Sequence, residues 1–152
     1  MKLAEALILR ADCQKRIEQL KERLTRSAKV QEGEQPPEDP PALITELDTT
    51  ISQLLELIKK INKTNSQTVL TNSKTISDAL AERDTLMLKR NVYSVLITKS
   101  SEKSYRYSRS EIKVLNTVNV TEMQKQVDIM SRQYRELDTK IQAANWNTEL
   151  IE

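Results

Sequence analysis

The sequence contains no histidine, one glycine (Gly33) and one cysteine (Cys13). Without histidine, the usual acid–base catalyst near pH 7 and the commonest zinc-binding imidazole are missing. A single glycine excludes the glycine-rich phosphate-binding motifs, and a single cysteine excludes an intrachain disulfide. The carboxylates do not form the Glu-x-x-His pattern of metal-binding bundles. We therefore expect no enzyme activity and no metal or cofactor site, with Cys13 as an inert, partly buried thiol.

The chain also lacks phenylalanine and any long apolar run. Aromatic residues make up 3% of the sequence and charged residues 30%, a composition that favours helices over sheets. The apolar run near the N-terminus is interrupted by Glu5 and ended by Arg10, so it matches neither a signal peptide nor a membrane span. The net charge of +2 indicates neither nucleic acid nor an anionic membrane as partner. These features predict a cytoplasmic protein with no membrane-spanning segment.

The clearest pattern is a heptad repeat near the C-terminus. Apolar residues recur there at alternating intervals of three and four, which places them on one face of a helix with ~3.6 residues per turn. The residues of this stripe are Val120, Met123, Val127, Met130, Tyr134, Leu137, Ile141 and Ala144. Because such a stripe is exposed to water in an isolated helix, this helix requires partner helices of similar length.

Similar periodicity predicts three further helices. The expected ranges are 2–30, 42–64, 75–98 and 120–144, and the second carries a heptad stripe of its own. The residues of that second stripe are Leu43, Leu47, Ile51, Leu54, Ile58 and Ile61. We predict an all-α fold in which these long, coiled-coil-like helices form an antiparallel four-helix bundle, as a single domain over residues 1–152. Because heptad stripes also serve subunit contacts, we expect a homo-oligomer.

Three connections separate these helices. Residues 62–73 are polar and β-branched, and we expect them to end the second helix with a loop or a short extended piece. The other two connections are longer loops. The loop at 31–41 contains all four prolines and is acidic, so no helix crosses it. We interpret it as a stiff connector, with a recognition segment as the alternative. The loop at 99–119 is rich in serine and basic residues.

This second loop carries the main candidate contact site. Tyrosines are interleaved with basic residues in it, a mixture that stacks on bases and neutralises phosphates. The candidate polyanion or partner contacts are Lys103, Tyr105, Arg106, Tyr107, Arg109 and Lys113. The alternatives are a solvated loop whose tyrosines cover the end of the bundle, or a segment that pairs with the acidic loop.

Arg83 and Arg90 lie close to the apolar face of the third predicted helix, seven residues apart. One interpretation is that their aliphatic stems cover apolar surface while the charged heads stay in water. The alternative is a polar seam inside the bundle, to which Arg10 and Gln14 of the first helix contribute.

Several segments resemble the septicolysin-like proteins, a little-characterised bacterial family. They are MKLAEALILRAD at 1–12, QEGE at 31–34 with the prolines after it, INKTN at 61–65, RYSRSEIK at 106–113, and Asn145-Trp146. The resemblance spans nearly the whole chain and implies a small helical protein with no assigned catalytic or binding residues. The family name suggests a haemolysin.

Three functions follow as hypotheses. The first is a non-catalytic structural or protein-interaction module that associates with itself. The second is a nucleic-acid-binding protein that uses the basic loop. The third, suggested only by the resemblance, is a membrane-active protein.

Overall fold

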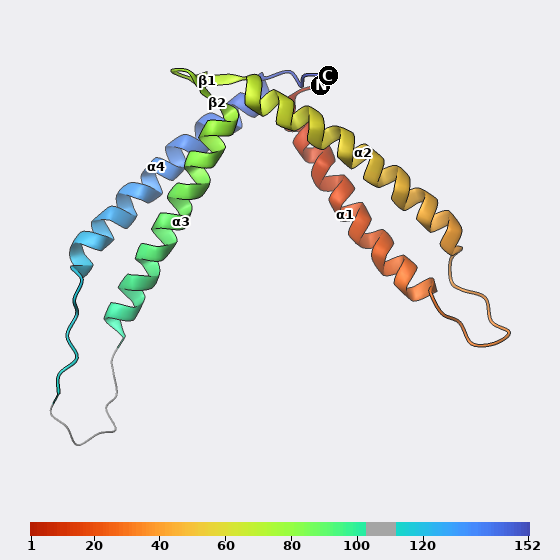
Figure 1. The fold of residues 1–152 in the computed structure, drawn as a ribbon, viewed down its shortest axis with the longest axis horizontal. Coiled ribbons are helices and arrows are strands. Elements are labelled where there is room, and N and C mark those ends of the chain that lie inside the picture. The colour runs from red at the N-terminus through yellow and green to blue at the C-terminus, as the bar shows by residue number, and fades with distance from the viewer. Residues whose placement is uncertain (103–111) are drawn as a thin grey trace. The chain divides into compact units, whose positions relative to one another are not determined.

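The computed structural model describes residues 1–102 and 112–152, which form four helices and one short β-hairpin (Figure 1). The helical character of these residues confirms the all-α expectation, to which the hairpin is an addition. The elements are α1 (Leu3–Ser27), α2 (Pro40–Gln67), β1 (Val69–Thr71), β2 (Lys74–Thr75), α3 (Ile76–Ser101) and α4 (Val120–Asn147).

The helix boundaries lie within three residues of the predicted ones. α2 begins at Pro40, because proline is well suited to the first turn of a helix, where its missing N–H is not needed. The same helix continues past the predicted end to Gln67. Thr64 in this last turn is fully buried, donates a hydrogen bond to the Lys60 carbonyl and accepts one from the Ile151 amide. These contacts stabilise the last turn of α2, although its polar sequence alone suggested a loop.

The chain divides into two compact units, which we describe separately. Unit 1 comprises Met1–Ser77 together with Gln142–Glu152, and unit 2 comprises Asp78–Ile141. The single domain over residues 1–152 stays a prediction.

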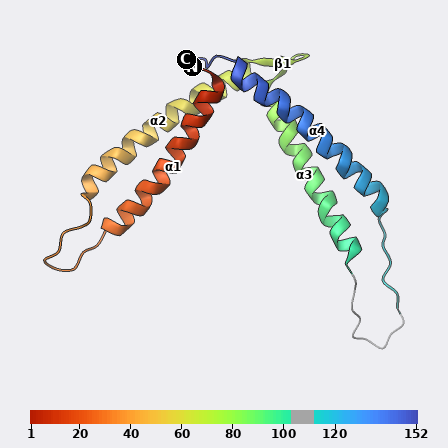
Figure 2. The same cartoon turned by 180° about the vertical axis from the view of Figure 1, so that it is seen from behind.

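In unit 1, α1 and α2 lie side by side in both views and run in opposite directions (Figures 1 and 2). Between them lie buried leucine and isoleucine side chains: Leu3 and Leu20 from α1, and Leu43 and Ile61 from α2. Burial of each such side chain stabilises the fold by roughly 1.5–3 kcal/mol. The pair is therefore held mainly by its apolar seam.

The α2 stripe differs from its prediction at one position. Ile51 is 46% exposed, and Thr50 is buried in its place. The Thr50 hydroxyl donates to the Glu46 carbonyl one turn earlier, so its burial leaves no unpaired donor. Threonine is thus compatible with this contact position, and the helix turns Ile51 away from α1.

The two ends of the chain meet within unit 1. The Leu3 amide donates to the Thr148 carbonyl at 2.9 Å, and the Leu150 amide donates to the Met1 carbonyl at 2.8 Å. The Glu149 carboxylate contacts both the Lys2 ammonium and the N-terminal amine, which together lower the pKa of Glu149. These contacts anchor the end of α4 beside the start of α1.

In unit 2, α3 and α4 also run antiparallel and side by side (Figures 1 and 2). The heptad stripe of α4 faces this contact, as predicted: Val127, Met130 and Ile141 are buried, and the other stripe residues are half-buried. Each unit thus contains an antiparallel helix contact. The assembly of four helices into one bundle stays a prediction.

Candidate interaction surfaces

Five of the six candidate contacts in the basic loop lie outside the described residues, which end at 102 and resume at 112. These five are Lys103, Tyr105, Arg106, Tyr107 and Arg109. The sixth, Lys113, is exposed and belongs to an irregular segment before α4. The nucleic-acid hypothesis for this loop therefore stays a prediction.

Arg83 and Arg90 both bind α4 across unit 2. The Arg83 Nη1 donates to Asp138 Oδ1 at 2.9 Å, and the Arg90 Nε donates to Ser131 Oγ at 2.7 Å. The Arg83 side chain is only 22% exposed, so its head is not free in water. In this unit the two arginines therefore form a polar seam.

The charge of Arg83 is favoured despite its burial. Desolvation disfavours the charged form, but hydrogen bonds to Asp138 and Asp84 outweigh it and raise the pKa of Arg83. The guanidinium contacts Asp84 on its own helix at 3.2 Å and Asp138 on α4 at 2.9 Å. The seam therefore keeps its charge at all physiological pH values.

The other two residues of the predicted seam lie on α1 in unit 1. Arg10 is half-buried, on the same helix face as Ala6 and Ile17, whereas Gln14 is exposed. Their participation in a seam with Arg83 and Arg90 stays a prediction.

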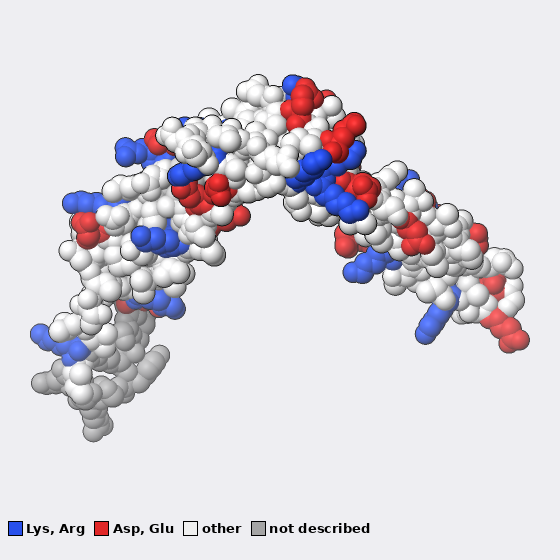
Figure 3. Space-filling model, turned by 45° about the horizontal axis from the view of Figure 1, so that its top comes forward, with Lys and Arg blue, Asp and Glu red and all other residues white. Residues whose placement is uncertain are grey.

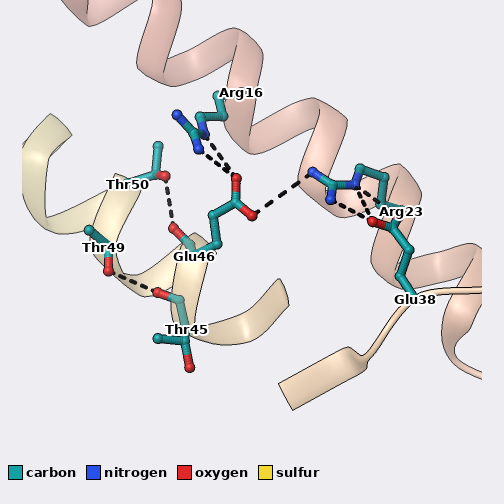
Figure 4. A network of polar contacts seen from close by, with 7 residues as sticks. All are labelled: Arg16, Arg23, Glu38, Thr45, Glu46, Thr49 and Thr50. Atoms are coloured by element: carbon teal, nitrogen blue, oxygen red, sulfur yellow. Dashed lines mark hydrogen bonds and ion pairs between the residues drawn. The ribbon is translucent and has the colours of Figure 1, made fainter. Parts of the chain in front are cut away.

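A charged network that the sequence did not reveal holds the acidic loop to α1 (Figure 4). The Arg23 guanidinium donates to both carboxylate oxygens of Glu38 and lies 4.0 Å from Glu46, which also accepts a hydrogen bond from Arg16 at 2.6 Å. The hydrogen bond from Arg23 lowers the pKa of Glu38, and Glu38 in turn raises the pKa of Arg23. This contact supports a connector role for the loop.

An open groove of about 830 Å³ lies between α1 and α2 in unit 1. Leu9 and Cys13 line it from α1, and Leu57 lines it from α2 together with five polar residues. Cys13 is a half-buried free thiol. The groove offers a mixed apolar and polar surface but holds no constellation of catalytic groups.

Apolar residues are also exposed on helix faces that point away from the partner helix. On α3, Leu88 is 65%, Val92 58% and Val95 59% exposed. On α2, Ile44, Ile51 and Leu55 are each about half exposed. Sequence reasoning assigned α3 a single apolar face and missed the second, although its residues recur at intervals of four and three.

Charges of both signs are mixed on the face of the molecule seen in Figure 3. Within the described residues, no group of three or more His, Cys, Asp or Glu side chains is placed to hold a metal ion. In the same part of the chain, no helix has both the length and the apolar character needed to cross a bilayer. The exposed apolar helix faces are thus the most distinctive surfaces of the described residues.

Comparison with known proteins places the chain beside proteins whose function is not established. Residues 10–150 match a model described as a family of unknown function, DUF6847. The crystal structure of a functionally unknown conserved protein from Corynebacterium diphtheriae is similar over 99% of both chains, with 44% sequence identity and a TM-score of 0.92. A search of curated proteins found no match.

Proposed function

Given that the chain belongs to the DUF6847 family of unknown function, we propose that it is a non-catalytic helical interaction module that associates with itself. The observation that carries this proposal is the second apolar face of α3, formed by Leu88, Val92 and Val95. We call it the α3 outer stripe.

The α3 outer stripe lies opposite the face of α3 that contacts α4. At ~100° per residue, Leu88 is turned by about 140° from Arg83, and Val92 by about 160° from Arg90. Both arginines bind α4, so the stripe points away from it. The helix therefore has two apolar faces, of which α4 covers one.

Contiguous exposed apolar residues on a helix are typical of a surface that another helix covers. The intervals of four and three in the stripe match those by which helices pack against each other. A second copy is a suitable partner because the net charge of +2 produces little repulsion between copies. The predicted antiparallel four-helix bundle is then an assembly that helices of two copies can form together.

The non-catalytic part of the proposal rests on the side chains available. The sequence has no histidine, and its one cysteine is half-buried in a helix beside α2. No observation on the residues that the structure describes favours the nucleic-acid-binding or the membrane-active alternative. The resemblance to septicolysin-like proteins stays a prediction.

The test is sedimentation velocity of the full chain over a wide range of concentrations. We expect wild type to associate, and the double variant Leu88→Gln plus Val92→Gln to associate at least tenfold more weakly, since ~1.4 kcal/mol corresponds to tenfold. Because both side chains are exposed, the variant should keep its helical circular dichroism.

Ile129→Gln is the matched control, because it removes an exposed apolar side chain from α4 outside the stripe. It should associate like wild type. An unchanged association of the double variant would exclude the α3 outer stripe, and a wild type that stays monomeric would reject self-association.

A further inference from the structure

The second exposed apolar face belongs to α2 in unit 1. Ile44 is 48%, Ile51 46% and Leu55 50% exposed, at intervals of seven and four residues that place them on one face. We call these three residues the α2 outer stripe. It lies away from the α1 contact, where Leu43 and Thr50 are buried.

Two opposite charges flank this stripe on one edge. Asp48 and Lys59 are both exposed and are eleven residues apart. Eleven residues correspond to about three turns and a net rotation of only ~20°, so the two side chains share a face about 16 Å apart along the axis. The stripe therefore has an acid near one end and a base near the other, too far apart to contact each other within one helix.

We propose that the α2 outer stripe binds the same stripe of a second copy, with the two helices antiparallel. A twofold axis perpendicular to the helices, midway between Ile51 and Leu55, pairs Ile51 with the partner's Leu55. The same axis brings Asp48 next to the partner's Lys59. By symmetry, the contact contains two such ion pairs. A parallel arrangement would instead place the partner's Asp48 and the partner's Lys59 on the opposite edge of the contact, where this ion pair cannot form.

The existing contact of Lys59 does not prevent this pairing. Lys59 Nζ lies 2.8 Å from Glu56 Oε1 on its own helix, and both side chains are about 60% exposed. Exposed pairs of this kind contribute little, so the flexible lysine can reach an acid on the partner at small cost. Joining two α1–α2 pairs through this face assembles four helices into an antiparallel bundle.

This inference rests on the proposed self-association and adds its orientation and a second contact surface. The test uses charge reversals in the full chain: Asp48→Lys, Lys59→Asp and the double variant. In the antiparallel arrangement, each single variant replaces both ion pairs between the two copies with pairs of like charge. We expect each single variant to associate about threefold to tenfold more weakly than wild type.

Two combinations should restore association. The double variant exchanges the charges and forms both ion pairs again. An equimolar mixture of Asp48→Lys with Lys59→Asp also forms two complementary pairs, although each variant alone is repulsive. Asp128→Lys is the matched control for Asp48→Lys, because it makes the same change in net charge at an exposed position on α4 and should associate like wild type.

The outcomes separate the inference from the proposed function. If wild type associates but the single variants associate equally well, the α2 outer stripe is not the contact and self-association stands. If the single variants weaken association and the double variant does not restore it, the antiparallel arrangement is wrong. If wild type is monomeric at every concentration, both proposals fail.

Discussion

Arg83 on α3 donates a 2.9 Å hydrogen bond to Asp138 on α4, from a position where its side chain is only 22% exposed. Arg90 repeats the contact seven residues later, with Ser131 as acceptor. A spacing of seven residues places both arginines on nearly the same face of α3, so they contact α4 in two successive heptads. This polar seam ties α3 to α4 in one register.

Asp138→Ala should destabilise the protein, because it removes the acceptor on α4 and leaves a half-buried guanidinium with Asp84 alone. We expect a loss of about 1–3 kcal/mol in the free energy of unfolding, measured by urea denaturation. Glu136→Ala is the control: Glu136 is 68% exposed and lies 3.9 Å from Arg132, so its removal should cost less than about 0.5 kcal/mol. Equal stability of the two variants would contradict the seam.

Met130→Ala should create a cavity beneath the α4 stripe, since Met130 is 4% exposed. The expected cost is about 2–5 kcal/mol in the free energy of unfolding. Ile129→Ala, one residue away and 40% exposed, should cost about 1 kcal/mol or less. If the Ile129 variant were the less stable of the two, the assigned contact face of α4 would be wrong.

Glu38 should titrate below the ordinary glutamate pKa of 4.5, because Arg23 hydrogen-bonds its charged form. A lowered folded-state pKa means that the contribution of Glu38 to stability is present above pH ~4.5 and is lost as the pH falls through the folded-state pKa. Carbon-13 NMR titration of the carboxyl group measures this directly. Arg23→Gln should return the pKa of Glu38 toward 4.5, and no change on that substitution would contradict the contact.

Ser73→Gly should stabilise the β-hairpin. Asn72 and Ser73 form its two-residue turn with φ values of 43° and 69°, the left-handed region that favours glycine at the second position. Relief of this strain, less the extra freedom of glycine in the unfolded chain, should add about 0.5–1 kcal/mol to the free energy of unfolding. Ser73→Ala keeps the strain and should bring no gain; an equal gain from both variants would refute the turn assignment.

The parts of the fold that depend on one helix at a time were predictable. The stripe from Val120 to Ala144 indicated the face of α4 that contacts α3, because helical periodicity alone determines which side chains share a face. The prolines and Gly33 marked the break between α1 and α2 for equally local reasons. Prediction was wrong at Ile51, because hydrophobicity favoured it over Thr50, whose hydroxyl is satisfied by its own helix.

The features that depend on how two helices are paired were not predictable. The contact between Arg23 and Glu38 requires the register of α1 against the loop, which no local pattern specifies. Arg83 and Arg90 were found as candidates from their spacing, but their acceptors Asp138 and Ser131 were not. The α3 outer stripe was overlooked because apolar residues lie on both sides of α3. The helical periodicity therefore does not distinguish one apolar face from the other.

Self-association is measured by the mass of the full chain in solution, from sedimentation equilibrium at several concentrations. One chain has a mass of 17.5 kDa. We expect the mass to rise above this value with concentration and to fall back in the Leu88→Gln plus Val92→Gln variant. A mass of one chain at every concentration would contradict self-association.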